Sequence, residues 1–214
     1  MTRCGYIAVS FLAILAQGDS FAAPIAPGSK IPWADLHWGF PPQLINVPEY
    51  CQGRSVVIVG LPGAFTPTCS STQVPGYLAN QEALKAVGVD EVVIYCVNDG
   101  AVMANWNQQQ LDTFGKENNL ITFMGDPSGE FTKLCGMELT DPRPAANGII
   151  GRCKRFAMHV VNNVVKYVAV SEGDDDPAGD ANPEASCAPA IIEAIKAQME
   201  LPLLERQYEE MNQN

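Results

Sequence analysis

Short apolar runs alternate along this chain with segments whose apolar residues recur at helical spacing. Residues 56–60, 91–97 and 121–124 are rich in β-branched side chains and are typical of buried strands. Between them, residues 70–87, interrupted at Pro75-Gly76, and residues 101–116 have the period of amphipathic helices. This alternation predicts an α/β fold whose sheet is covered by helices on both faces.

The last third of the chain predicts a hairpin followed by a helix. Residues 156–161 and 164–170 have the pattern of strands and flank Asn162 and Asn163, two residues that tolerate a positive φ in a tight turn. Residues 188–199 carry their isoleucines on one helical stripe. A short strand is also predicted near residues 43–46, so the sheet should be mixed, with an antiparallel edge.

The first 22 residues are predicted to be a targeting signal rather than part of the domain. A short basic start precedes the mostly apolar residues 6–16, which are too few to span a bilayer, and small residues follow at 20–24. The segment of residues 20–24 also resembles the cleavage site of the leader sequences that direct proteins into complex plastids through the ER. We expect the secretory pathway or such a plastid, with a mitochondrial or cytoplasmic location as the alternative. Residues 23–200 then form the domain, and 201–214 a polar helical extension.

Charge and cysteine content exclude several functions. The net charge of −11 argues against binding to nucleic acids or anionic membranes. Residues 172–184 hold six carboxylates without Lys or Arg, which predicts a solvated loop. Asp174, Asp176 and Asp180 lack the spacing of an EF-hand calcium loop, and no other metal or cofactor site is predicted. None of the seven cysteines forms a Cys-x-x-Cys pair, so a thioredoxin-type redox pair is absent from the sequence.

The candidate for chemistry is Cys69, placed where the first buried strand ends and a helix begins. The partial positive charge of a helix N-terminus favours thiolate over thiol. Thr66 can form a hydrogen bond with the sulfur, and Pro62 and Pro67 restrict the loop between them. From the residues alone, the alternative is a small buried hydrophobic side chain, which is the usual role of a free cysteine.

The segment Pro62-Gly63-Ala64-Phe65-Thr66-Pro67-Thr68-Cys69-Ser70 resembles the peroxidatic site of the peroxiredoxins, in the atypical two-cysteine subfamily called type five or type II. Further motifs of the resemblance are Val97-Asn98-Asp99 before a helix with Trp106, Lys154-Arg155-Phe156 with Met158, and Ala188-Pro189. The resemblance implies a thioredoxin-like mixed sheet and an antioxidant thiol-dependent peroxidase for hydrogen peroxide and alkyl hydroperoxides.

The resemblance also implies roles for single residues. Cys69 would attack the peroxide and become a sulfenic acid. Arg155 would point at its sulfur, and an arginine suits this task because its planar fork can bond sulfur and peroxide oxygen together. Thr66 would bond to thiolate and peroxide, while Pro62 would shield the sulfur. Phe65 and Trp106 are expected to pack rather than to react.

The sulfenic acid must then be resolved by a second thiol. Cys187 matches the resolving cysteine of animal-like members, although the loop before it is longer and more acidic than usual. An external thiol such as glutathione is the alternative. Cys96 is disfavoured, because it lies two residues before Asn98 whereas plant-like members have a cysteine four residues before that Asn. The remaining cysteines after the signal are expected to be bystanders (Cys51, Cys135 and Cys153). Thioredoxin or glutathione/glutaredoxin is the expected reductant, and a homodimer is implied by analogy.

Two other functions compete with the peroxidase. A peroxide-sensing redox relay, which passes its disulfide to a client protein, would use the same residues. A cysteine hydrolase would need His159 or His37 as its base, and is disfavoured because His159 lies within an alternating strand pattern.

Overall fold

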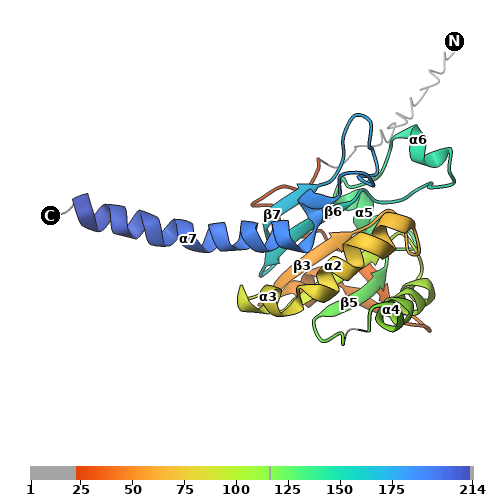
Figure 1. Cartoon of the computed structure of the whole chain (residues 1–214), viewed down its shortest axis with the longest axis horizontal. Helices are drawn as coiled ribbons and strands as arrows, with labels where there is room; N and C mark the ends of the chain where they lie inside the picture. Colours follow the sequence, from red (N-terminus) through yellow and green to blue (C-terminus); the bar gives the residue numbers. More distant parts are fainter. Residues whose placement is uncertain (1–22, 116, 213–214) are drawn as a thin grey trace, which may run out of the picture.

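The computed structural model describes residues 23–115 and 117–212, which form one mixed sheet with helices on both faces (Figure 1). The strand order is β2-β1-β5-β4-β3-β6-β7. The strands are β1 (Asp35–Trp38), β2 (Gln43–Asn46), β3 (Ser55–Gly60), β4 (Glu91–Cys96), β5 (Ile121–Gly125), β6 (Phe156–Val161) and β7 (Val164–Val170). The thioredoxin-like α/β fold expected from the sequence is confirmed.

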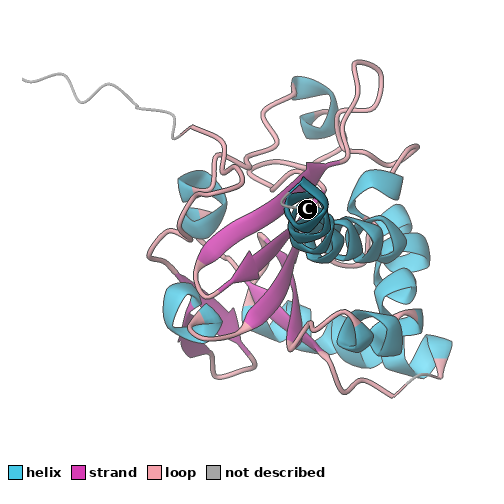
Figure 2. Cartoon of the chain, turned by 90° about the vertical axis from the view of Figure 1, so that its left-hand side faces the viewer, coloured by secondary structure: helices cyan, strands magenta, loops and turns pink. Residues whose placement is uncertain are grey.

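Two hydrophobic clusters fill the space between the sheet and its helices (Figure 2). Residues of α2 (Val74–Ala79), α3 (Gln81–Ala86), α4 (Gly100–Phe114) and α7 (Ala188–Asn212) pack on one face. Residues of α1 (Val47–Cys51) and α5 (Glu130–Leu134) pack on the other. The short α6 (Pro142–Ala145) lies in the connection between α5 and β6.

The central strand β3 explains why its sequence is apolar without alternation. It pairs in parallel with β4 and antiparallel with β6, so it has neighbours on both edges. Its four residues Val56, Val57, Ile58 and Val59 are all buried, because helices or loops cover both faces of the sheet. Burial on both faces removes the need for polar residues at alternate positions.

The hairpin was predicted correctly, and the helix over residues 70–87 only in part. Asn162 and Asn163 have φ values of 47° and 66° between β6 and β7. Residues 70–87 instead contain a π-helical turn (Cys69–Gln73), α2 and α3. The predicted interruption at Pro75-Gly76 was wrong, and the break is at Asn80. Pro75 lies in the first turn of α2, where a proline removes no hydrogen bond that the helix needs.

The last helix is longer than its apolar stripe. α7 begins at Ala188 as predicted and continues through Asn212, into the residues expected to form a polar helical extension, so that it extends beyond the sheet (Figure 1). Among the described residues, no helix is both long enough and apolar enough to cross a membrane. The predicted targeting signal, residues 1–22, lies outside the described part of the chain.

One edge of the sheet brings together segments from distant parts of the sequence. β3 and β4 are parallel and end at this edge, whereas β6 is antiparallel and begins there. Gly60 is paired with Phe156, and a Cβ at Gly60 would overlap with the Phe156 ring, so a glycine is required. The residue before Phe156, Arg155, is therefore placed beside the loop that follows β3.

Candidate active site

Cys69 and Arg155 meet at this edge of the sheet. Cys69 is the first residue of the π-helical turn, and both side chains are fully buried. The Arg155 Nη1 donates to the Cys69 Sγ at 3.4 Å. A buried guanidinium at hydrogen-bonding distance from the sulfur can stabilise negative charge that develops there during a reaction. The two residues that the motifs marked for peroxide chemistry, 86 positions apart, are thus in direct contact.

The other donors of Arg155 are held by the acidic loop between β7 and α7. Its Nε donates to the Ala178 carbonyl at 3.2 Å, and its Nη2 donates to the Asp180 carboxylate at 2.5 Å. The guanidinium is therefore oriented by three acceptors, one of which is the sulfur. The sequence indicated the arginine but did not indicate this contact with the loop.

The acidic loop is itself ordered by hydrogen bonds. The Asp176 carboxylate accepts from the backbone N–H groups of residues 180, 181 and 182, at 2.8, 2.9 and 3.0 Å. Although burial opposes its ionisation, these donors hold the pKa of Asp176 below its ordinary value. The Thr68 hydroxyl donates to the Asp180 carbonyl at 3.2 Å. The segment predicted as a solvated loop is therefore fastened to the active-site loop.

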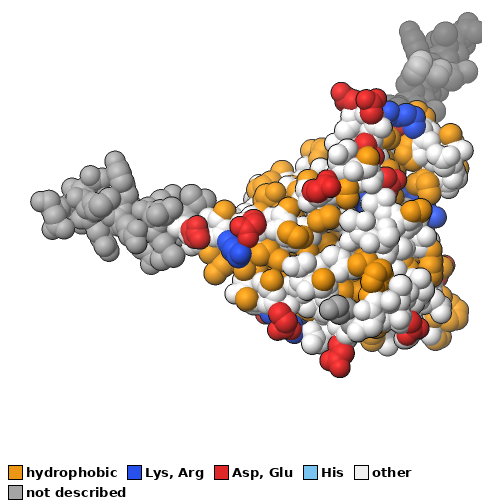
Figure 3. All heavy atoms as spheres, in the orientation of Figure 1, with side chains coloured by type: hydrophobic (Ala, Val, Ile, Leu, Met, Phe, Trp, Pro, Cys, Tyr) orange, Lys and Arg blue, Asp and Glu red, His pale blue; other side chains and the backbone are white. Residues whose placement is uncertain are grey.

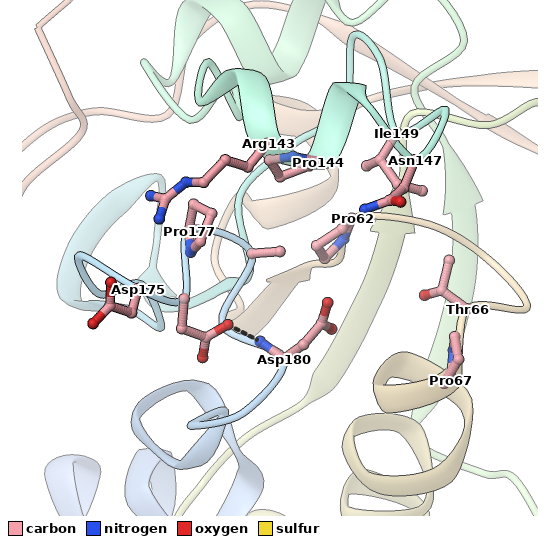
Figure 4. A pocket seen from close by; sticks show the side chains of 12 residues that line it. Pro62, Thr66, Pro67, Arg143, Pro144, Asn147, Ile149, Asp175, Pro177 and Asp180 are labelled. Carbon is pink, nitrogen blue, oxygen red and sulfur yellow. Dashed lines mark hydrogen bonds between the residues drawn. The ribbon is translucent and has the colours of Figure 1, made fainter.

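Thr66 and Pro62 line a cavity of about 530 Å³ beside the acidic loop (Figure 4). The Thr66 hydroxyl donates to the Gly63 carbonyl at 2.8 Å, and the expected hydrogen bond to the sulfur is not formed in this structure. The Ser70 N–H donates to the Thr66 carbonyl at 3.0 Å, which ties the loop to the turn that carries Cys69. Cys69 does not line the cavity, so solvent reaches the loop and not the sulfur.

Sequence reasoning missed one residue that supports the loop, Arg152. Its Nη1 donates to the Val97 carbonyl at 2.8 Å and to the Asn98 Oδ1 at 2.7 Å. The same Asn98 oxygen accepts from the Ala64 N–H at 3.3 Å. Arg152 therefore connects the end of β4 to the loop before Cys69. The only feature of the sequence that could have indicated Arg152 is its position three residues before Arg155.

Phe65 and Trp106 pack beside this loop, as expected. Their ring centroids lie 6.3 Å apart, and the Trp106 Nε1 donates to the Ser70 Oγ at 3.0 Å. Phe65 has a φ of 62°, which is uncommon for a residue other than glycine and is often found near functional sites. Its side chain remains half-exposed.

Comparison with known proteins shows which family this chain belongs to. The Redoxin family model matches residues 26–184. Peroxiredoxin-2D of Arabidopsis thaliana is 36% identical over 156 residues, which are 72% of this chain and 91% of that protein. Peroxiredoxin-2C of Oryza sativa subsp. japonica is 38% identical over 154 residues, 71% of this chain and 90% of that protein. The chain belongs to the peroxiredoxin family.

Solved structures agree with the family assignment. Reduced Prx3 of Vibrio vulnificus in complex with H₂O₂ has a TM-score of 0.69 and 33% identity, covering 82% of this chain and 98% of that one. Peroxiredoxin 5 of Alvinella pompejana has a TM-score of 0.62 and 25% identity, covering 81% and 99%. This peroxiredoxin is therefore a thiol-dependent peroxidase, with peroxide substrates and a thiol reductant.

Cys187 lies directly before α7 and contacts the turn that carries Cys69. Its Sγ donates to the Gln73 Oε1 at 3.6 Å and to the Pro183 carbonyl at 3.3 Å. Burial, and then the nearby Glu184 carboxylate, raise the pKa of Cys187, although Arg155 acts in the opposite direction. The six cysteines of the described residues are all free thiols in this structure.

The other cysteines of this peroxiredoxin are poor candidates for reaction. Cys51, Cys96, Cys135 and Cys153 are fully buried. Burial raises the pKa of Cys51 to about 11 and raises the pKa values of the other three well above the ordinary range. They therefore remain neutral thiols near pH 7, which supports the bystander role expected for Cys51, Cys135 and Cys153 and the disfavoured position of Cys96 as a resolving thiol.

The two histidines do not support a cysteine hydrolase. The His159 Nε2 bonds to the Ser55 Oγ at 2.9 Å, at the end of β3 opposite to Cys69. His37 lies in β1, paired with Leu44 and Gly125. Within residues 23–115 and 117–212, no group of three or more His, Cys, Asp or Glu side chains could hold a metal ion.

Proposed function

We propose that Cys69 is the peroxidatic thiol of this peroxiredoxin and that Arg155 is its cationic partner. The 3.4 Å contact between the Arg155 guanidinium and the Cys69 sulfur carries this assignment. Both groups are buried. A charge-assisted hydrogen bond is stronger in the protein interior than at the surface. The H₂O₂ complex of the Vibrio vulnificus relative supports hydrogen peroxide as one substrate.

In the proposed reaction the Cys69 thiolate attacks one oxygen of the hydroperoxide. A sulfur–oxygen bond forms as the oxygen–oxygen bond breaks, and Cys69 becomes a sulfenic acid. The leaving oxygen takes up a proton and departs as an alcohol or as water. Arg155 stabilises the negative charge that develops along this path. The Thr66 hydroxyl, turned from the Gly63 carbonyl toward the substrate, would donate to a peroxide oxygen, while Pro62 shields the sulfur.

Cys187 is the proposed resolving thiol. It would attack the Cys69 sulfenic acid, forming a Cys69–Cys187 disulfide and releasing water. Contact with Gln73, four residues after Cys69, supports this assignment. Both cysteines are free thiols in this structure, so the two sulfurs must come together before the disulfide forms. An external thiol acting directly on Cys69 is the alternative route.

One experiment tests both thiols. The mature protein, Cys69→Ser and Cys187→Ser are each treated with one equivalent of peroxide and examined by peptide mass spectrometry. We expect a Cys69–Cys187 disulfide in the wild type, a sulfenic acid at Cys69 in Cys187→Ser, and no oxidation at Cys187 in Cys69→Ser. Oxidation of another cysteine first would contradict the assignment.

The physiological setting is proposed from the relatives. We place the protein in the type five or type II subfamily, as a dimer reduced by thioredoxin or by glutathione and glutaredoxin. Peroxiredoxin-2E of Arabidopsis thaliana, 32% identical over 155 residues, is described as chloroplastic, which supports organellar targeting by residues 1–22. The N-terminal mass of the protein from its native cells tests this. The family comparisons support a peroxidase and do not favour a redox relay.

A further inference from the structure

The ion pair between Arg155 and Asp180 lies where the buried site meets solvent. Arg155 is fully buried, whereas the side chain of Asp180 is 58% exposed and lines the 530 Å³ cavity. In Figure 4 the Asp180 side chain lies beside Pro62, between the two walls of the cavity. The Asp180 carboxylate therefore lines the cavity and is also bonded to the guanidinium that contacts Cys69.

The remaining charged groups of the cavity add negative charge. Asp175 and Asp176 also line it, and the only other charged lining residue among the described residues is Arg143. Arg143 pairs with Asp141 at 2.8 Å and donates to the Asp174 carbonyl at 2.7 Å, so its charge is compensated. Its guanidinium points away from Thr66 (Figure 4). Acidic side chains also gather at the end of the molecule that carries α6 (Figure 3).

The uncharged lining of the cavity is mainly apolar. Pro62, Pro144, Ile149, Pro177 and Ala178 form much of its wall. A volume of about 530 Å³ exceeds what hydrogen peroxide needs and is sufficient for a small organic hydroperoxide. The site therefore combines an apolar cavity wall with the Arg155 guanidinium, whose charge is compensated by Asp180, a residue that lines the cavity.

From these contacts we propose that Asp180 makes this peroxidase select uncharged hydroperoxides over anionic ones. This inference rests on the proposed role of Cys69 and Arg155. A free arginine would attract an anionic peroxide, but here the same guanidinium is bonded to a carboxylate at 2.5 Å. An anion that reaches Arg155 must approach Asp180, and like charges in a partly desolvated site repel each other. An uncharged alkyl hydroperoxide meets no such repulsion and gains contact with the apolar wall.

The test compares two small probes on the full chain, tert-butyl hydroperoxide as the neutral one and peroxymonosulfate as the anionic one. Second-order rate constants for Cys69 oxidation are measured in wild type and Asp180→Asn, with Cys69→Ser as the background. Asn keeps an acceptor for the Arg155 Nη2 but removes the charge. We expect the anionic-to-neutral ratio of rate constants to rise roughly five- to tenfold, because one charge close to the reaction centre is lost. Intrinsic reactivities of the probes cancel in this comparison.

Asp175→Asn is the matched control. It removes one charge from the same cavity wall without touching Arg155, so the ratio should change less than about twofold. An unchanged ratio in Asp180→Asn, or equal changes in both variants, would overturn the proposal. Failure of tert-butyl hydroperoxide to oxidise Cys69 in the wild type would instead reject the proposed function.

A measurement on the wild type keeps the proposal testable if Asp180→Asn does not fold. Raising the ionic strength from about 20 mM to about 0.5 M screens interactions between exposed charges. The reaction with peroxymonosulfate should then accelerate, whereas that with tert-butyl hydroperoxide should not change. If added salt slows the anionic reaction, the site attracts anions and the inference is wrong.

Discussion

Cys69 and Cys187 occupy similar local positions but differ in their surroundings. Each lies at the start of a helical segment, where backbone N–H groups point toward the chain entering the helix. Cys69 is fully buried and accepts a hydrogen bond from the Arg155 guanidinium. Cys187 is half-buried, lies three residues after Glu184, and donates to the Gln73 amide oxygen and the Pro183 carbonyl.

This difference shows that a helix start does not by itself make a thiol reactive. Cys187 has this position, yet burial and Glu184 raise its pKa. What Cys69 has in addition is a cation delivered by β6, from a part of the chain 86 residues away. This tertiary contact is the observation that supports the proposed attack by Cys69 and the proposed later role of Cys187.

Replacing Cys69 should have the largest effect on the first oxidation step. Cys69→Ser should lower the rate of peroxide consumption by more than about 1,000-fold, because a serine hydroxyl has no accessible anion at neutral pH. Peroxide turnover with a thiol reductant measures this. Cys51→Ala, which removes a buried thiol in the other core cluster, should stay within about twofold of wild type. Retained turnover in Cys69→Ser would show that Cys69 is not the thiol that attacks the peroxide.

Removing the cation should have the next largest effect. Arg155→Ala should slow oxidation of Cys69 by roughly 100-fold, because both thiolate and developing charge lose their stabilisation. Arg155→Lys keeps the charge but not the fork that bonds sulfur and Asp180 together, so an intermediate rate is expected. Stopped-flow oxidation rates and alkylation of Cys69 at pH 7 measure both variants. Wild-type rates in Arg155→Ala would show that the 3.4 Å contact has no chemical role.

Cys187→Ser should separate attack from resolution. The first equivalent of peroxide should be consumed within about twofold of the wild-type rate, because Cys69 and Arg155 are untouched. Turnover with thioredoxin should be lost, and excess peroxide should convert the persistent sulfenic acid to sulfinic acid. Mass spectrometry of Cys69 follows both outcomes. If the variant turns over with glutathione as fast as wild type, an external thiol resolves Cys69 and Cys187 is incidental.

The smallest expected effect concerns the acidity of Cys187. Glu184 raises the pKa of this thiol, so Glu184→Gln should lower it toward the ordinary value and increase the thiolate fraction at a given pH. Alkylation of Cys187 at pH 8 should become roughly two- to threefold faster, since the thiol is only partly desolvated. Peptide-resolved alkylation kinetics measure the change. Glu193→Gln, on an exposed turn of α7, should leave the rate unaltered.

Much of the fold follows from local sequence pattern. The run that forms β3 is apolar at every position, and Asn162-Asn163 supplies the two positive φ values that a tight hairpin turn needs. The break between α2 and α3 could not be inferred in this way. Pro75 marks a helix interruption in isolation, but a preceding π-helical turn places it in a first turn, where it is tolerated.

The same distinction between local sequence and tertiary structure applies to the candidate active site. The sequence indicates the candidate reacting groups because the segment from Pro62 to Cys69 and the motif around Arg155 resemble those of peroxiredoxins, and such motifs are local in the sequence. The sequence could not indicate that Ala178 and Asp180 hold the guanidinium, or that Arg152 fastens Asn98. Those contacts depend on the antiparallel register of β6 against β3, which brings Arg155 to the end of β3. Sequence thus determined which groups are present, and tertiary structure decided which charges they meet, because ion pairs depend on distance in space rather than along the chain.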